Sequence, residues 1–176
     1  MTTDQLVRSL IDNHSTTANF ICSLTDAQFV HSHSGKWSAA QQLSHLILCL
    51  MPINQALAAR DYIREKFGVQ SRAAMSYDDV IANYKAGLQN GGKAPERFLP
   101  PVIDVAQRDT LRNQLDEILI ALRDQISTYS EAELDTLVLP HPFMGLLSIR
   151  EMLYLMSYHP LHHLAQVKEH LVQPSA

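Results

Sequence analysis

The segment that decides the fold is "SIREMLYLMSYHPLHHLAQVKEH", residues 148–170. Ser148 is followed three residues later by Glu151, which is the pattern of a capping box, so we expect a helix to begin there. At a rotation of about 100° per residue, apolar side chains gather on one side of this helix. The members of this stripe are Ile149, Met152, Met156 and Val167. Such a stripe is typical of a helix that buries one face against other helices.

The same two signals, a cap and an apolar stripe, predict further helices. Ser or Thr precedes Gln or Glu by three residues at Thr2/Gln5, Thr25/Gln28, Ser38/Gln41 and Ser130/Glu133. Long helices are expected over 3–21, from 38 past Pro52 toward Arg60, and from Arg108 through the leucine-rich segment that follows. A shorter helix is expected within 75–102, ending at Gly91 and Gly92. Only "LDTLVLPHPFMG", residues 134–145, has strand character.

Four long helices with short connections and one long middle crossover predict an all-α fold. We expect a four-helix bundle of the up-down-down-up type, formed by residues 1–176 as a single domain. In such bundles, sites are built in the interior from side chains on facing helices.

Composition excludes several classes of partner. The net charge of −4, from 14 basic and 18 acidic residues, argues against binding to nucleic acid or to an anionic membrane. The most apolar stretch, residues 43–59, is interrupted by His45, Pro52, Asn54 and Gln55, which argues against a membrane span. No secretory signal is expected, and two cysteines without a CxxC pair predict no disulfide framework. We therefore expect a cytoplasmic protein.

The histidines of the last helix suggest a metal site. His159 and His163 are four residues apart and face the same inward side, so both imidazoles can reach one ion. His45, beside the inward stripe of the second long helix, is the candidate third ligand. Three neutral imidazoles bind Zn, Ni or Fe(II) and leave positions open for water or substrate. His162 falls in the sector of Glu151 and is expected to face solvent or a partner; the alternative for all of these histidines is an ordinary surface or hydrogen-bonded core position.

Other residues are weaker candidates. Cys49, one turn beyond His45, is either a fourth ligand, a reactive thiol or, as we favour, a small core residue. Pro160 is expected to kink the last helix beside a ligand, and Pro52 to bend the second long helix in a similar way. Further pocket candidates, each with an ordinary packing or loop role as the favoured alternative, are His14, His31, His33, His141, His170, Gln166 and Trp37. His170 is about 10 Å along the helix axis from His163, too far to share its ion.

Two motifs give the chain a family resemblance. They are "KWSAAQQLSHL", residues 36–46, and "HPFMGLLSIREMLYLMSYHPLHHLAQV", residues 141–167. With these motifs the sequence resembles the DinB/YfiT-like family of metalloenzymes. The resemblance implies metal ligands at His45, His159 and His163, a four-helix bundle, often a homodimer, and a divalent ion such as Ni or Zn. It also implies hydrolase-like or thiol-dependent transfer activity.

The predicted function is that of a metal-dependent enzyme. The ion would activate water, or a low-molecular-weight thiol, for attack on a small-molecule substrate. No HExxH motif supplies a general base. The alternative is a non-catalytic dimeric bundle that acts as a stress-related binding or interaction protein. The run "LILCLMP", residues 46–52, is apolar nearly all round its helix, which favours a homodimer interface on its second side.

Overall fold

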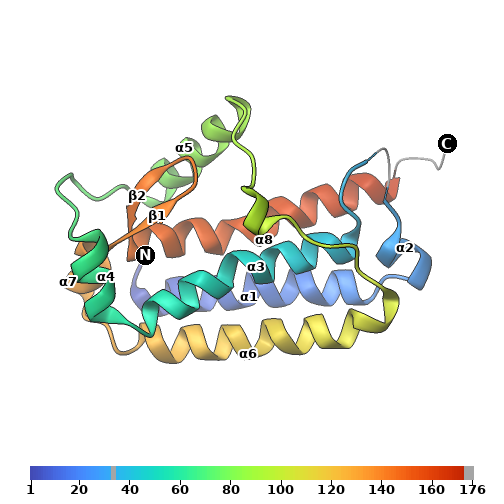
Figure 1. The fold of residues 1–176 in the computed structure, drawn as a ribbon, viewed down its shortest axis with the longest axis horizontal. Helices are drawn as coiled ribbons and strands as arrows, with labels where there is room; N and C mark the ends of the chain where they lie inside the picture. Colours follow the sequence, from blue (N-terminus) through green and yellow to red (C-terminus); the bar gives the residue numbers. More distant parts are fainter. Residues whose placement is uncertain (33–34, 173–176) are drawn as a thin grey trace.

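The computed structural model describes residues 1–32 and 35–172. The protein is mostly helical, which confirms the all-α expectation. Four long helices lie side by side in Figure 1: α1 (Thr3–Cys22), α3 (Ala39–Leu57), α6 (Arg108–Ile126) and α8 (Ile149–Val172). In that view α1 and α8 run from left to right, and α3 and α6 run from right to left.

The core lies between these four helices. α1 packs against α8 and α6, and α3 packs against α6 and α8. Each helix buries the apolar stripe that its sequence predicts, since aliphatic side chains at three-and-four spacing share one face. Fully or nearly fully buried members are Leu6, Leu10, Leu43, Leu50, Leu115, Leu122, Ile149 and Met152.

Helix caps fix where the elements begin. The capping boxes predicted at Thr2, Thr25, Ser38 and Ser130 are all formed. At the fifth, the Ser148 backbone N–H donates to Glu151 Oε2 at 2.8 Å and the Glu151 N–H donates to Ser148 Oγ at 3.1 Å. Each cap satisfies N–H groups that a helix start leaves unpaired, and stabilises the helix by about 1 kcal/mol.

The long connection between α3 and α6 contains α4 (Arg60–Phe67), α5 (Tyr77–Gln89) and two 3₁₀ helices, η1 (Glu96–Phe98) and η2 (Val105–Gln107). α5 is the short helix expected before the glycine pair, and Gly91 takes a φ of 90° just after it. α5 packs against α8, while η1 packs against α3. The crossover therefore covers the two helices that carry the candidate histidines.

The remaining elements lie at the ends of the long helices (Figure 1). They are α2 (Asp26–Val30), α7 (Glu131–Thr136) and the strands β1 (Val138–His141) and β2 (Gly145–Ser148). The strands pair as an antiparallel hairpin in which His141 is opposite Gly145, so the predicted strand character is confirmed. Because β2 runs directly into α8, the hairpin lies beside the first turns of that helix.

Neither internal proline ends its helix, so the predicted continuation past Pro52 is confirmed, and the bends expected at Pro52 and Pro160 stay predictions. α3 continues through Pro52, which lies on an exposed side where water can hydrate the carbonyl that loses its N–H partner. α8 is likewise continuous through Pro160. Near Pro160, α1 donates two hydrogen bonds to the backbone of α8: Thr17 to the Pro160 carbonyl at 3.2 Å, and Asn13 to the Ser157 carbonyl at 2.8 Å.

Within the apolar run 46–52 of α3, which packs against α1, α6, α8 and η1, Leu46, Ile47 and Leu50 are buried, whereas Met51 and Pro52 are exposed. This packing explains why the run is apolar on several sides, and the homodimer stays a prediction. Among the described helices, none by itself has the length and apolarity to cross a membrane; α3 and α4 pass that test only as a pair bent by 95°.

Candidate metal centre

Three imidazoles from two helices meet in the structure. His45 comes from α3, and His159 and His163 come from α8. Their ring centroids are 5.2 Å apart for His45 and His159, 4.7 Å for His45 and His163, and 4.5 Å for His159 and His163. All three side chains are buried, at 4 to 5% exposure. The three rings selected from the sequence therefore lie beside one another, and their joint role as metal ligands stays a prediction.

Hydrogen bonds orient two of these rings. The Nδ1 of His45 is 2.8 Å from the Phe98 carbonyl oxygen, and the Nδ1 of His163 contacts the amide oxygen of Gln42. Both oxygens can only accept, so each Nδ1 carries the proton and donates it. The Nε2 atom of each ring is then left with a lone pair, which is the form in which an imidazole binds a metal ion.

His159 completes the cluster. Its Nε2 is 2.9 Å from the Nε2 of His163, and its Nδ1 is buried without a hydrogen-bond partner among the described residues. Two nitrogen ligands that each lie about 2.0–2.1 Å from one ion are about 2.9–3.4 Å apart when the angle between them is about 90–110°. The observed separation of the two Nε2 atoms is therefore compatible with a shared ion.

Cys49 is also part of this cluster. Its Sγ lies 3.5 Å from the Nε2 of His45, one helical turn away. One ligand atom from each of His45, Cys49 and His159 can be chosen such that all lie within 4.8 Å of one another, and this group does not include His163. Cys49 is half-buried and lines the cavity described below, whereas the sequence favoured a core position for it.

Burial sets the charge of the cluster. Removal from water is the main cause that lowers the pKa of His45, and it holds the pKa values of His159 and His163 well below 6.5. The imidazoles are therefore neutral at pH 7, as metal binding requires. Burial also raises the pKa of the Cys49 thiol to about 12. A nearby divalent cation opposes this effect, because a coordinating thiol is deprotonated outright.

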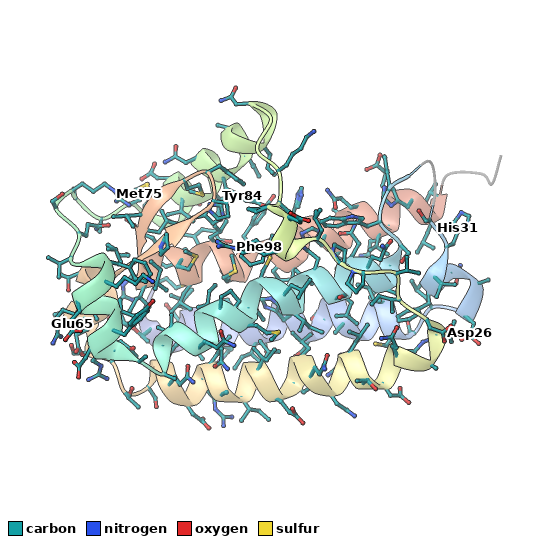
Figure 2. All side chains as sticks on the ribbon, in the orientation of Figure 1. Asp26, His31, Glu65, Met75, Tyr84 and Phe98 are labelled. Carbon is teal, nitrogen blue, oxygen red and sulfur yellow. The ribbon has the colours of Figure 1, made fainter. Side chains whose placement is uncertain are left out.

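The cluster lies in the wall of a cavity of about 900 Å³, large enough for a small molecule. Aromatic rings form much of the remaining wall: Trp37, Tyr84, Phe98 and Phe143. The Trp37 ring centroid is 4.8 Å from that of His45, and Tyr84 stacks on Phe143 at 5.6 Å. Tyr84 and Phe98, both labelled in Figure 2, belong to the crossover, in α5 and η1.

The prediction that His162 faces away from the site is wrong. The His162 side chain is half-buried and lines the cavity, and its Nε2 accepts from the Gln166 amide at 3.1 Å. Glu151, placed in the same outward sector, is only 1% exposed. The helix-wheel prediction failed because α5, α7 and the hairpin also pack against α8, and the Tyr84 ring of α5 lies 6.1 Å from that of His162.

The other candidate histidines lie outside the cluster, and two of them line the same cavity. His14 is fully buried, and its Nδ1–H donates to a carbonyl of its own helix at 2.8 Å, while its Nε2 lacks a partner among the described residues. His141 and His170 line the cavity. His31 is exposed, and His33 lies outside the described residues.

Sequence reasoning missed the residues that orient the ligands. Gln42 was not singled out as a candidate. Its spacing of three residues before His45 was an available signal, because that spacing places both on one face. Phe98 contributes a backbone carbonyl, which any residue type supplies, so no sequence pattern could have indicated it.

The described residues form a helical protein in which neutral imidazoles and a thiol gather at the wall of one cavity. These features define a candidate metalloprotein. Residues 9–167 match the model of the DinB superfamily, so the chain belongs to that superfamily, which is metal-binding. The uncharacterized protein YuaE of Bacillus subtilis (strain 168) is 25% identical over 154 residues, which cover 87% of this chain and 89% of YuaE. The family resemblance read from the two motifs is confirmed.

Proposed function

We propose that this protein is a metal-dependent enzyme whose divalent ion is held by His45, His159 and His163. The observation that carries the proposal is the convergence of these three rings at the wall of a cavity of about 900 Å³. A structural site closes its ion off from solvent and substrate, whereas a catalytic site faces a space that a substrate can enter.

Each group around the ion has a separate task. A divalent ion held at this site supplies a Lewis acid that lowers the pKa of a bound nucleophile. Gln42 and the Phe98 carbonyl hold His163 and His45 in the tautomer that presents Nε2. Trp37 and Tyr84 offer apolar faces, so the substrate is expected to carry an apolar or aromatic group.

The charges around the cavity favour a thiol over water as the nucleophile. Of the described residues that line the cavity, only Glu169 carries a carboxylate, and that side chain is exposed. No carboxylate base therefore lies beside the imidazoles. A thiol, with a pKa near 8.5, needs a far smaller shift to ionise at neutral pH than water does, at about 15.7. Thiol-dependent transfer to an electrophilic small molecule is thus preferred to hydrolysis.

The donor set and the fold complete the proposal. Imidazole ligands suit Ni, Zn and Fe(II) better than Mg or Ca. The fold is proposed to be an up-down-down-up four-helix bundle, which the helix directions in Figure 1 support. The enzyme is further proposed to be a cytoplasmic homodimer that acts on a small molecule, without nucleic-acid or membrane partners.

Metal analysis of the full chain, purified without a His tag, tests the ligand assignment. The wild-type protein and a His31→Ala control, at an exposed loop position, are expected to hold one equivalent of Ni or Zn. His45→Ala, His159→Ala and His163→Ala are expected to lose it. Stoichiometric metal in the three variants would contradict the assignment.

Activity needs its own assay. The metal-loaded protein is incubated with low-molecular-weight thiols and an electrophilic acceptor, and in parallel with activated esters and amides. The proposal expects turnover that chelation abolishes. Turnover that survives chelation excludes a metal mechanism, and absence of turnover in every assay favours the non-catalytic binding protein.

A further inference from the structure

We infer that the Cys49 thiolate is a fourth protein ligand to the ion, so that the centre has three nitrogen donors and one sulfur donor. The inference rests on the proposed function in one respect, since it assumes that an ion is held by the three histidines. It adds a residue that lies outside the ligand set implied by the two family motifs.

The first support is the distance between Cys49 and His45. A zinc-like ion lies about 2.0–2.1 Å from an imidazole nitrogen and about 2.3 Å from a thiolate sulfur, so tetrahedral ligands place N and S about 3.6 Å apart. Cys49 Sγ and His45 Nε2 are 3.5 Å apart. The Nε2 of His45 is also the nitrogen that the Phe98 carbonyl leaves with a lone pair.

The second support is the arrangement of two matched pairs on packed helices. His45 and Cys49 are four residues apart on α3, as His159 and His163 are on α8, and α3 packs against α8. The i, i+4 spacing places both members of a pair on one face. Ligand atoms from the two helices approach within 4.8 Å in the group His45, Cys49 and His159.

The third support is an unpartnered polar group at the same point. His159 is 5% exposed, and its Nδ1 has no hydrogen-bond partner among the described residues. A buried polar atom without a partner costs about 1–3 kcal/mol, and a ligand bound at this Nδ1 would remove that cost. Within the described residues, the hydrogen-bond contacts of the Cys49 thiol are to the His45 ring alone.

A sulfur donor changes which ions the centre holds and what they can do. Thiolate with imidazole favours Zn, Co, Ni and Fe(II) and disfavours Mg and Ca. Four protein ligands fill a tetrahedral zinc ion, whereas an ion that accepts five or six ligands keeps positions for a substrate. The inference therefore predicts that activity depends on the metal, with Ni or Fe(II) supporting turnover better than Zn.

Cobalt substitution tests the sulfur ligand directly. The full chain is loaded with Co(II), and its near-ultraviolet spectrum is recorded for thiolate-to-cobalt charge transfer. The matched control is Cys22→Ser, which removes the chain's other cysteine, at the end of α1. Wild type and Cys22→Ser are expected to show the band, while Cys49→Ser and Cys49→Ala lose it and still bind one equivalent of cobalt.

Each outcome is decisive. A band that survives in the Cys49 variants, or a cobalt-loaded wild type without a band, overturns the sulfur ligand and leaves the three-histidine centre intact. A protein that takes up no cobalt overturns both. If the Cys49 variants do not fold, alkylation of wild type decides: zinc loading is expected to suppress labelling of Cys49 and not of Cys22. Equal labelling of Cys49 with and without zinc overturns the inference.

Discussion

Replacing Gln42 with leucine tests whether the candidate ligands are held in place by hydrogen bonds. Gln42 is 2% exposed, and its amide oxygen accepts from the Nδ1–H of His163. Leucine has a similar volume, so the main loss is one hydrogen bond, which leaves a buried N–H without an acceptor and costs about 1–3 kcal/mol. At about 2–4 °C per kcal/mol for a domain of this size, the melting temperature is expected to fall by about 2–12 °C. A lost orienting partner also weakens metal affinity by about 10–100-fold.

Chelator competition on the full chain measures the affinity, and thermal unfolding without metal measures the stability. Gln42→Glu keeps an acceptor for His163 and is expected to bind metal at least as tightly as wild type, because carboxylates commonly fill this role. Gln55→Leu, at an exposed position on the same helix, is the control and should change neither quantity. Wild-type affinity in Gln42→Leu, or equal weakening in Gln42→Leu and Gln42→Glu, would refute the reasoning.

Three further predictions follow from single contacts. Trp37 is the chain's one tryptophan, and its ring centroid is 4.8 Å from that of His45. Paramagnetic Co(II) or Ni(II) bound at the site is therefore expected to quench the fluorescence of Trp37. Quenching that persists in His45→Ala would contradict the assignment of the site. Burial lowers the pKa of His14 to about 4, below the 6.5 of an unfolded histidine. The unfolded chain therefore takes up the proton first as the pH falls, so His14 lowers the free energy of unfolding by about 3 kcal/mol between pH 6.5 and pH 4. Urea titrations across this range should show that the free energy of unfolding depends less on pH in His14→Leu than in wild type. An equal pH dependence in the two proteins would count against the argument. Glu151 is 1% exposed and accepts two hydrogen bonds from Arg72, at 2.7 and 2.6 Å. Glu151→Leu is therefore expected to lower the free energy of unfolding by about 3 kcal/mol. A decrease under about 1 kcal/mol, measured by urea unfolding, would disprove the stabilising role of this pair.

The starts of the long helices could be predicted because caps are local. Thr2, Ser38 and Ser148 each pair with a residue three positions away, so a few adjacent letters contain the whole interaction. α4 was missed for the same reason: Ala59 precedes it and makes no side-chain cap. The continuation of α3 past Pro52 was predicted correctly, and the size of any bend at this proline stays a prediction.

The convergence of the imidazoles could be predicted because spacing on one helix fixes direction. His159 and His163 share a face whatever surrounds them. His162 was misplaced because a helix wheel describes one helix and carries no information about elements that cover its other sides. Those elements belong to the crossover and the hairpin, whose positions depend on contacts between segments far apart in the chain.

The energetics of the cluster explain why a functional role is the better interpretation of these residues. Three imidazoles buried without their charges gain little for the fold, and the unpartnered Nδ1 of His159 costs about 1–3 kcal/mol. Apolar side chains of similar volume would pack the same space without that cost. A ligand that binds only the folded chain reverses the balance, since at a concentration 100 times its dissociation constant it adds about 2.7 kcal/mol of stability. Because His45 and His159 lie on helices far apart in the sequence, an ion bound between them joins α3 to α8. Buried polar side chains that destabilise the fold and lie together at one cavity wall are expected where a protein binds a ligand.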